Sequence, residues 1–591
     1  MTHTNPTDRM INRRSLLRFG VVGAGSIAAA TVLSSCNNAD TPAPGESIAP
    51  TGVEGVEQVQ LGEEITEGIF YPDPYVGPRA YVREPFYTGD KTFTIGVKLS
   101  SDVVDDWNTN EFSRWMEERT GVKVEYKVVI NTDSDLTRVN AQITAGDMPD
   151  AYLGLPFTAD QVSLYGSQGL FHPLEDLIET YSPMMRQIMS DYPDWGATLT
   201  ARDGHKYQIS TPNDCFHCRV SPGRAFINQK YLDAVGASMP ETTEELREVL
   251  KQFKEQDPSG TGSMIPFAVG SSEWGDFIDS YIMNSFLYNP GSDGQGGGWL
   301  RLVDGQVDFA ANRPEWREAL RYLRTLNLDG TLDRTAFTIT GDELLRAGNQ
   351  GRLGFVRSYY WGWFADIDYE NPDALWRDYV SVPPLAGPEG VRYARWDYES
   401  DRSRPFVITK NCENPEVLVQ WADYMMDLEG GLRGSSGNED NWSYVEEGGL
   451  GIDGRQALYW GKSWPAPAGT SWGSATLSYS SNDQRLAAYV DANSPTLEVD
   501  LYNATTVYEE FKPPQEMYLP SMIFDESAAA RRADIATSIE SHVRSNMAAF
   551  AIGEKDIEDD GAWDEYVAAL ESMGLLEYID LHQQAHDARQ G

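Results

Sequence analysis

Apolar and polar residues follow regular patterns from residue 92 onward. Residues 92–99 and 122–130 each alternate apolar and polar side chains, which predicts two strands. Apolar residues at helical spacing lie between them, and a second helical pattern over 136–143 precedes a short apolar stretch at 150–154. This strand–helix–strand–helix–strand order predicts parallel strands with right-handed crossovers, and therefore an α/β fold class.

The rest of the chain continues this mixture of helical and strand-like stretches. Residues 351–356 form a strand pattern that runs directly into the aromatic segment 359–363. The helix predicted to begin within 240–246 has a threonine cap and acidic residues in its first turn, which interact favourably with the helix dipole. The other helical stretches are 314–326, 416–426, 527–547 and 563–574, and the sequence shows no internal repeat.

Residues 1–36 have the pattern of an export signal: a cationic start, a short apolar run and a small-residue ending. The pair Arg13-Arg14 resembles a twin-arginine signal. The ending at 33–36 resembles a bacterial lipobox, in which the cysteine becomes the lipidated first residue. We therefore expect a lipoprotein anchored by acyl chains on Cys36 at the extracytoplasmic face of the cell membrane, without spanning it. An ordinary cleaved signal with an incidental cysteine is the alternative.

The segment that follows the signal differs from the body of the chain. Residues 37–90 are rich in Pro, Gly, Glu and Thr and show little helical or strand period. Such a composition predicts a flexible tether between the lipid and the folded body.

Charge and aromatic content narrow the classes of function. The chain has 591 residues with 90 acidic and 47 basic side chains, a formal net charge of −43. This excess of acid argues against binding nucleic acid, because phosphates would be repelled. The chain also has 16 Trp and 30 Tyr, many of them in glycine-rich or loop-like contexts where a core role is less automatic.

Two of the four cysteines lie close together. Cys215 and Cys218 form a C-x-x-C pattern, whereas Cys412 stands alone. In an oxidising compartment the pattern is compatible with a local disulfide that closes a very small loop and contributes modestly to stability. Free thiols and metal or redox chemistry are the alternatives, although a zinc site would need a further ligand that the local sequence does not supply.

Six landmarks, in order along the chain, resemble bacterial extracellular solute-binding proteins of the carbohydrate-import type, the lipoprotein receptors of ABC transporters. The landmarks are 145–151 (AGDMPDA), 203–207 (DGHKY), 226–246, 352–355 (RLGF), 408–424 and 563–574 (WDEYVAALESMG). Each landmark is weak alone, but their order and spacing behind a lipobox indicate the family.

The resemblance implies a two-lobed fold of the type II periplasmic-binding-protein class, with a hinge and an interlobe cleft. Family topology sends the chain back once, which assigns 91–211 and 377–428 to lobe 1, and 212–376 and 429–591 to lobe 2. Closure of the hinge around the ligand is the mechanism that such proteins share.

Some members of this family carry a calcium loop after the first long helix of lobe 2, and the corresponding stretch here is Asp257–Pro266. Its glycine turns remain, but the later acidic ligands are absent, and Ca²⁺ prefers six to eight oxygen ligands. We therefore expect a plain turn and no bound cofactor, with calcium as the alternative.

A sugar presents hydroxyls and a weakly apolar C–H face, so its site needs flat aromatic rings beside carboxylate or amide groups. Several loop-like segments combine these groups, and a polar pair follows the first crossing strand. The candidate ligand-binding residues are Tyr360, Trp361, Trp363, Glu273, Trp274, Trp396, Asp397, Trp442 and Asp214. For either Trp361 or Trp363 alone, packing into the lobe core is the alternative.

The function that we expect is capture of a carbohydrate, an oligosaccharide in particular, and its delivery to the permease subunits of an ABC importer. The expected partners are the carbohydrate, the permease and the membrane through the lipid alone; we expect a monomer and no nucleic acid. A receptor for peptides or another non-sugar solute is the alternative. A surface-anchored glycoside hydrolase is a further alternative, but no nucleophile elbow, H-E-x-x-H or phosphate loop is present, so we expect no enzyme.

Overall fold

The computed structural model describes residues 61–99, 106–131, 136–221, 223–270, 278–291, 298–332, 334–399, 401–402, 405–462, 466–491 and 496–590. Within these ranges no helix is both long and apolar enough to cross a membrane. The proposed lipidation site Cys36 lies outside the described residues.

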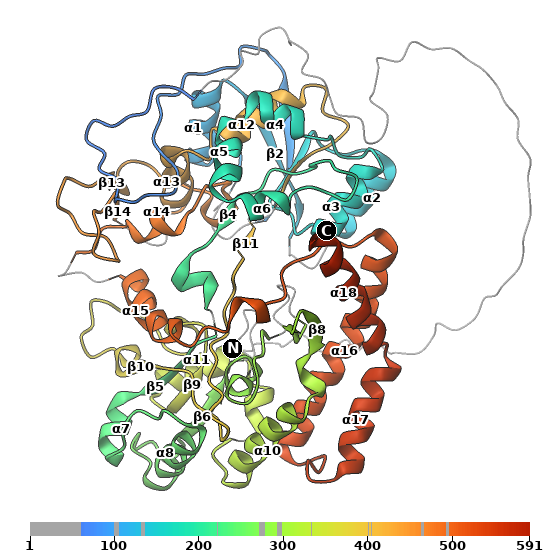
Figure 1. The fold of residues 1–591 in the computed structure, drawn as a ribbon. Helices are drawn as coiled ribbons and strands as arrows, with labels where there is room; N and C mark the ends of the chain where they lie inside the picture. Colours follow the sequence, from blue (N-terminus) through green and yellow to red (C-terminus); the bar gives the residue numbers. More distant parts are fainter. Residues whose placement is uncertain are drawn as a thin grey trace, which may run out of the picture. The chain divides into compact units, whose positions relative to one another are not determined.

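The first sheet has the strand order β12-β3-β1-β2 (Figure 1). Its strands are β1 (Thr92–Lys98), β2 (Lys123–Ile130), β3 (Ala151–Leu153) and β12 (Phe406–Ile408). β1 pairs in parallel with β2 and β3, and β12 pairs antiparallel with β3. The parallel pairing confirms the arrangement predicted from the strand–helix order.

Helices connect and cover the strands of the first sheet. They are α1 (Glu111–Thr120), α2 (Thr137–Ala145), α3 (Ala159–Ser167), α4 (Glu175–Tyr181), α5 (Pro183–Asp191), α6 (Pro193–Ala197) and α12 (Pro415–Asp423). α1 begins where the Asn110 side chain accepts a hydrogen bond from the Phe112 amide. It ends at Gly121, whose φ of 77° lies in the left-handed region that glycine adopts readily.

The second sheet has the order β10-β5-β9-β6 and mixes parallel and antiparallel pairs. Its strands are β5 (Ala225–Asn228), β6 (Ile265–Val269), β9 (Leu353–Arg357) and β10 (Tyr379–Val382). β5 pairs antiparallel with β9 and β10, whereas β6 pairs in parallel with β9. β9 therefore ends where the aromatic segment 359–363 begins, as predicted.

Helices of very different lengths pack around the second sheet. They are α7 (Gln229–Val235), α8 (Thr243–Gln256), α10 (Pro314–Leu328), α11 (Gly341–Asn349), α15 (Leu497–Glu509), α16 (Glu526–Ile552), α17 (Asp560–Ser572) and α18 (Leu575–Gln590). The predicted threonine cap of α8 is present: Thr242 and Glu245 form a reciprocal capping box.

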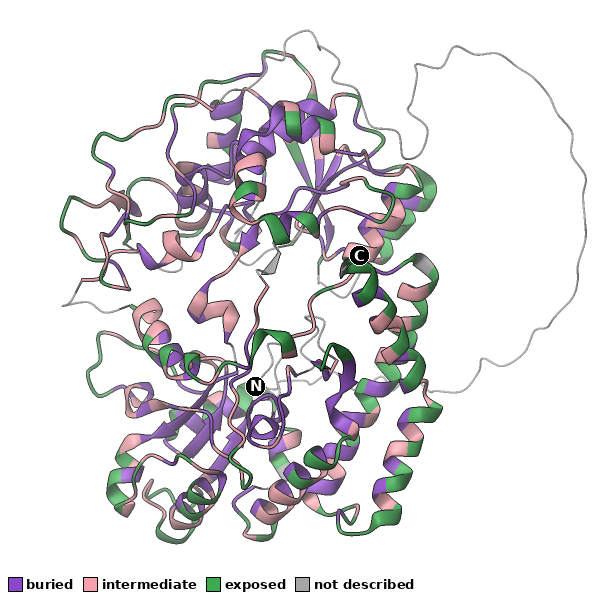
Figure 2. Ribbon diagram, in the orientation of Figure 1, coloured by how far each residue is buried: buried purple, intermediate pink, exposed green. Residues whose placement is uncertain are grey.

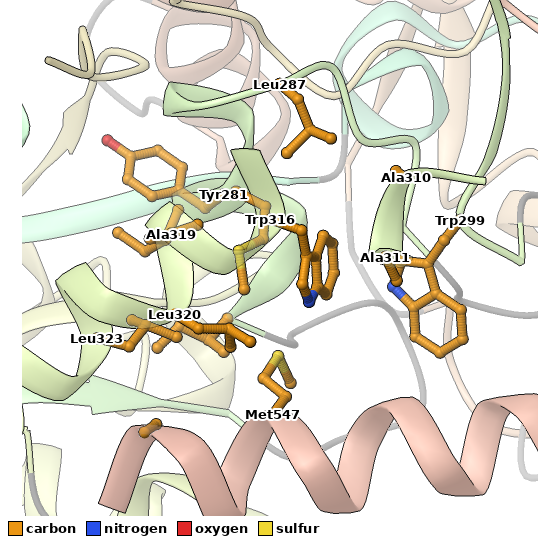
Figure 3. Packing of buried hydrophobic residues seen from close by; sticks show 14 of the residues in the cluster. Tyr281, Leu287, Trp299, Ala310, Ala311, Trp316, Ala319, Leu320, Leu323 and Met547 are labelled. Carbon is orange, nitrogen blue, oxygen red and sulfur yellow. The ribbon is translucent and has the colours of Figure 1, made fainter. Parts of the chain in front are cut away.

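The core beside the second sheet joins helices that are far apart in sequence. Trp316, Leu320 and Leu323 of α10 are buried together with Met547 of α16 (Figure 3). Figure 2 shows the strands of both sheets largely buried, as expected for sheets with helices on their faces.

Two short strands link the regions of the two sheets. β4 (Pro212–Asn213) pairs antiparallel with β11 (Asp401–Arg402). The chain returns to the first sheet through β12 and α12. The predicted start of this return at residue 377 is too early, because β10 pairs with β5 and Leu385 lies in the core beside the second sheet. β4 leads directly into the segment that contains the C-x-x-C pattern.

The predicted lobe boundary at residue 429 does not match the packing. Residues 429–591 are predicted to belong to lobe 2, but Trp472, Leu477 and Tyr479 lie in the core of the first sheet. The chain joins the second region at α15, where Leu501 and Ala504 pack with residues of β9 and β10. The elements between these points are α13 (Leu428–Ser436), β13 (Trp442–Tyr444), β14 (Tyr459–Gly461) and α14 (Asn482–Leu486).

The predicted flexible tether over 37–90 extends too far, because residues 61–90 form a packed arm. The apolar side chains of Ile69 and Ala80 share a buried cluster with Leu428 and Leu432 of α13. Aromatic residues and an arginine of the arm supply buried contacts that hold it in place, although its sequence shows no helical or strand period. Residues 37–60 lie outside the described residues.

Candidate functional site

The C-x-x-C pattern lies in a turn next to a strand that links the two sheet regions. Cys215 and Cys218 are joined by a disulfide at the start of a π-helical turn, η1 (Phe216–Val220). The amides of Arg219 and Val220 both donate to the carbonyl of Cys215. We call residues 213–221 the disulfide turn.

Among the described residues, no group of His, Cys, Asp and Glu side chains is placed to hold a metal ion.

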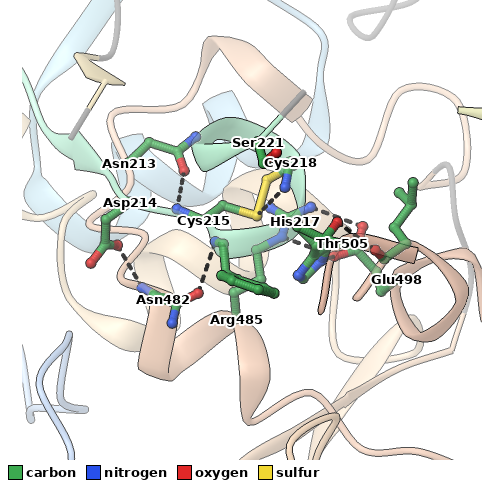
Figure 4. The surroundings of a disulfide bond; sticks show 12 residues. Asn213, Asp214, Cys215, His217, Cys218, Ser221, Asn482, Arg485, Glu498 and Thr505 are labelled. Atoms are coloured by element: carbon green, nitrogen blue, oxygen red, sulfur yellow. Dashed lines mark hydrogen bonds and ion pairs between the residues drawn. A yellow bond between two sulfur atoms is a disulfide. The ribbon is translucent and has the colours of Figure 1, made fainter. Parts of the chain in front are cut away.

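Hydrogen bonds to α14 hold the first part of the disulfide turn (Figure 4). Asp214 accepts from the Asn482 amide at 2.6 Å and from the Tyr192 hydroxyl at 2.9 Å. The Phe216 amide donates to the Asn482 side-chain oxygen at 3.0 Å. Burial raises the pKa of the Asp214 carboxyl, and the hydrogen bonds oppose this effect. Asp214 therefore uses both carboxylate oxygens to position the turn.

An ion cluster holds the middle of the disulfide turn. His217, fully buried, lies 2.7 Å from a carboxylate oxygen of Glu498 on α15, and Arg485 of α14 donates two hydrogen bonds of 2.9 Å to the same carboxylate. Burial lowers the pKa of His217, although Glu498 opposes the shift. Burial alone would raise the pKa of Glu498, but Arg485 and His217 outweigh it and hold that pKa below its usual range.

The aromatic segment after β9 contacts the far side of the disulfide turn. The Tyr359 hydroxyl donates to the Cys218 carbonyl, and the Trp363 ring lies 6.1 Å from the Tyr359 ring and 6.2 Å from the Tyr360 ring. Arg224, which is fully buried, donates to the carbonyls of both His217 and Tyr359. The structure thus brings the predicted residues Tyr360 and Trp363 close to the disulfide turn.

The segment 395–398 completes this group of rings. The Trp396 ring packs edge-on against Phe216 at 6.0 Å, and the Asp397 amide donates to the Val220 carbonyl at 2.8 Å. Asp397 accepts a hydrogen bond of 2.6 Å from the Tyr518 hydroxyl. Burial raises the pKa of the Asp397 carboxyl, so this acid is held in apolar surroundings beside aromatic rings.

Eight aromatic side chains lie on the disulfide turn or are linked to it through ring contacts and hydrogen bonds, and seven of them are half-buried, with Trp396 more fully enclosed. We call them the aromatic group: Phe216, Tyr359, Tyr360, Trp363, Trp396, Tyr398, Tyr502 and Tyr518. Half-buried rings beside carboxylates supply apolar faces and hydrogen-bond acceptors together.

A separate pocket, about 290 Å³ in volume, lies at the arm and is lined by Arg83, Pro85, Trp115, Glu118, Arg119 and Glu429.

Two of the predicted tryptophans pack elsewhere. Trp361 is only 5% exposed, its ring lies 4.7 Å from Phe226, and its indole N–H donates to the Tyr379 carbonyl. Trp442 is 4% exposed and packs in the cluster beneath the arm. Both indoles are thus parts of the core, the alternative for Trp361, and the candidate Trp396, 7% exposed, also lies in the core cluster beside the second sheet. Glu273 and Trp274 lie outside the described residues.

Five members of the aromatic group were not among the sequence candidates, and one of them, Tyr398, directly follows the candidate Asp397. Phe216 lies inside the C-x-x-C pattern, so the disulfide prediction could have drawn attention to it. Tyr359 lies beside the predicted Tyr360. Tyr502 and Tyr518 come from α15 and the loop after it, and the sequence offers no local signal that would place them at the turn.

The predicted turn at Asp257–Pro266 is closed by its own side chains. The Asp257 carboxylate accepts hydrogen bonds from the Ser259 hydroxyl and, at 2.7 Å, from the Gly262 amide. These bonds hold the pKa of Asp257 below its usual range. The loop thus uses its single carboxylate for internal hydrogen bonds.

Solved structures of similar shape define the class of fold. The FusA substrate-binding protein of Streptococcus pneumoniae in complex with kestose matches with a TM-score of 0.66 and 23% identity, over 85% of this chain and 99% of that chain. An HMO-binding, ABC-transporter-associated solute-binding protein from Bifidobacterium longum infantis matches with a TM-score of 0.68 and 19% identity, over 85% of this chain and 99% of that chain. The fold is the two-lobed, type II periplasmic-binding-protein-like fold that we predict.

Sequence comparison identifies the family. Residues 102–431, more than half of the chain, match the bacterial extracellular solute-binding proteins, and the chain belongs to this family. It is 30% identical over 319 residues to the fructooligosaccharide ABC transporter substrate-binding protein FusA of S. pneumoniae serotype 4, covering 52% of this chain and 56% of the relative. It is 22% identical over 334 residues to the lipoprotein LipO of Bacillus subtilis, covering 54% and 62%. These matches span less than two thirds of either relative.

Proposed function

We propose that this protein is the substrate-binding receptor of an ABC importer and that its ligand is an oligosaccharide. The family and the sugar-binding relative support the class of function. The observation that carries the ligand class is the convergence of three distant segments, 213–221, 359–363 and 395–398, into one aromatic group with Asp397 beside it. Aromatic faces suit the C–H face of a sugar, and carboxylate oxygens suit its hydroxyls.

The structure shifts the proposed roles among the predicted residues. Trp363 and Tyr360 are half-buried and are the proposed stacking surfaces, whereas Trp361 and Trp442 support the fold. Asp397 is the proposed hydroxyl acceptor, because the Tyr518 hydroxyl and the Glu399 amide both donate to its Oδ1. Asp214 accepts one hydrogen bond on each carboxylate oxygen and is proposed to position the disulfide turn instead.

The proposal includes the anchor and the motion of the protein. Acyl chains on Cys36 hold it at the extracytoplasmic face of the membrane, and the permease subunits receive the sugar. The two sheet regions close around the ligand through the linking strands β4 and β11. Binding occurs without turnover of the sugar.

A titration of the full chain with kestose and fructo-nystose, the sugars in complexes of the relative FusA, tests the proposal. W363A is expected to weaken binding at least tenfold, about 1.4 kcal/mol, because an aromatic side chain at the centre of an interface contributes strongly. The matched control is W460A, since Trp460 is 41% exposed on β14 and lies outside the aromatic group.

Three outcomes would redirect the proposal. Binding of peptides in place of any saccharide would support the non-sugar receptor. Release of smaller sugars during incubation would support a hydrolase. Equal effects of W363A and W460A would remove the aromatic group from the binding site.

A further inference from the structure

The disulfide turn connects the linking strands to the aromatic group through backbone atoms. The Cys218 carbonyl accepts from Tyr359, the Val220 carbonyl accepts from the Asp397 amide, and the Ser221 hydroxyl donates to the Arg395 carbonyl. All three contacts depend on the path of the backbone between residues 215 and 221. The disulfide restrains the first half of this path.

The disulfide turn also determines the direction of the Phe216 side chain. The Phe216 ring lies between Trp396 at 6.0 Å and Tyr502 at 5.5 Å. Phe216 stands inside the covalent loop closed by Cys215 and Cys218, so its direction follows from the conformation of that loop. A π-helical turn is a rare conformation that is frequent at functional sites.

We propose that the Cys215–Cys218 disulfide is a positioning element for ligand binding: it fixes the π-helical turn that holds Phe216 against Trp396 and the Cys218 carbonyl against Tyr359. The proposal rests on the proposed function, because it takes the aromatic group as the saccharide site. Cys215 and Cys218 themselves contact no ligand.

The size of the loop separates positioning from general stabilisation. A disulfide stabilises a protein mainly by restricting its unfolded chain, and this effect is small for a loop with only two residues between the cysteines. Loss of the bridge is therefore expected to change the melting temperature little. Its effect on affinity is expected to be larger, since the backbone groups that contact Tyr359 and Asp397 become free to move.

Reduction by a dithiol supplies a reversible way to open the bridge. A thiolate of the reductant attacks Sγ of Cys218, which is half-buried, and displaces the Cys215 thiolate, because Cys215 is only 1% exposed. The second thiol of the reductant then attacks the reductant's own sulfur in the mixed disulfide. This step releases the Cys218 thiolate and forms a cyclic disulfide of the reductant. The protein gains two electrons and two protons as two thiols.

The test compares the oxidised full chain, the dithiothreitol-reduced chain and C215S/C218S, with C412S as the matched control. Affinity for kestose and fructo-nystose is measured by calorimetry, and amide hydrogen exchange is followed at 213–221 and 395–398. Reduction and C215S/C218S are each expected to weaken binding about tenfold and to speed exchange in both segments. C412S is expected to stay within twofold, since Cys412 is buried in the first sheet's core and outside the turn.

A second variant distinguishes positioning from a merely structural role. Y359F removes the hydroxyl that donates to the Cys218 carbonyl. If the bridge positions that carbonyl, Y359F weakens binding in the oxidised chain and has a smaller effect in C215S/C218S, because coupled residues act non-additively. Additive effects would contradict positioning through this contact.

Failure of this proposal can be told from failure of the proposed function. Unchanged affinity and unchanged exchange after complete reduction, checked by alkylation of both thiols, would overturn the positioning role. If the oxidised chain binds neither sugar, the proposed ligand fails, whereas faster exchange on reduction at 213–221 and 395–398 still supports positioning and unchanged exchange still overturns it.

Discussion

Two ion clusters hold together segments that are hundreds of residues apart in sequence. The first joins the arm to the first sheet: Arg83 lies 3.1 Å from Asp423, and Arg119 lies 2.6 Å from Asp427. Arg83 also approaches Asp427 at 3.4 Å. The side chains of Asp423 and Asp427 are fully buried, and that of Arg83 is 1% exposed.

The second cluster joins the disulfide turn to α14 and α15. It consists of Glu498 between Arg485 and His217, and the side chains of Glu498 and Arg485 are 32% and 29% exposed. The first cluster pairs two guanidinium groups with two carboxylates. The second contains the imidazole of His217, whose pKa burial lowers from the usual value near 6.5. The first cluster thus fixes the arm. The second contains a histidine whose protonation affects the contacts of the disulfide turn at the proposed ligand site.

Breaking the first cluster is expected to have the largest effect on stability. R83M removes the guanidinium but leaves Asp423 buried, so the free energy of unfolding is expected to fall by about 3–5 kcal/mol, as measured by urea denaturation. R83K retains the charge with fewer donors and is expected to lie between R83M and the wild type.

The matched control for R83M lies on the same arm. Arg79 pairs with Glu64, and these side chains are 35% and 33% exposed, so R79M is expected to cost only about 0–1 kcal/mol. Equal losses in R79M and R83M would show that the arm is not held by the buried pair.

Breaking the second cluster is expected to have a smaller effect on stability but a clear one on binding. E498Q keeps the shape and removes the charge that Arg485 and His217 face. The hydrogen bonds to Arg485 are charge-assisted, but about a third of each side chain is exposed, so we expect a loss of about 1–2 kcal/mol. Affinity for kestose is expected to fall because His217 belongs to the disulfide turn.

The control for E498Q lies on the same helix. Glu509 is exposed near the end of α15, and E509Q is expected to change stability by less than about 0.5 kcal/mol and to leave kestose binding unchanged. A wild-type affinity in E498Q would separate the ion cluster from the ligand site.

The comparison also shows what could be predicted from the sequence. Periodic patterns are local, so the strand–helix order of residues 92–154 and the Thr242 cap of α8 were predictable. The arm has no period; its order depends on Arg83 meeting Asp423, 340 residues away. A local composition rule therefore assigned it to the tether.

The predicted site residues separate for the same reason. Trp361 and Trp363 are two positions apart in one segment with the same composition, but the short 3₁₀ turn η5 (Trp361–Trp363) places Trp361 against Phe226 and Trp363 beside Tyr359. The positions of the two indoles depend on contacts with β5 and with the disulfide turn, which lie over 130 residues earlier in the sequence. Composition identified the segment, and only tertiary packing distinguishes the two indoles.

The smallest expected effect is on the pH dependence of the free energy of unfolding, and it concerns His217 of the second cluster. Because burial lowers the pKa of His217 below the usual value near 6.5, the unfolded chain takes up a proton there before the folded chain does as pH falls. This histidine therefore removes stability as pH falls below about 6.5. Glu498, whose pKa is also lowered, removes further stability as pH falls below the usual glutamate value of about 4.3. In urea denaturation between pH 7 and pH 5, H217Q is expected to show a shallower fall in stability than the wild type. A wild-type slope in H217Q would place the acid sensitivity in other histidines, such as His582, whose pKa burial lowers to about 4.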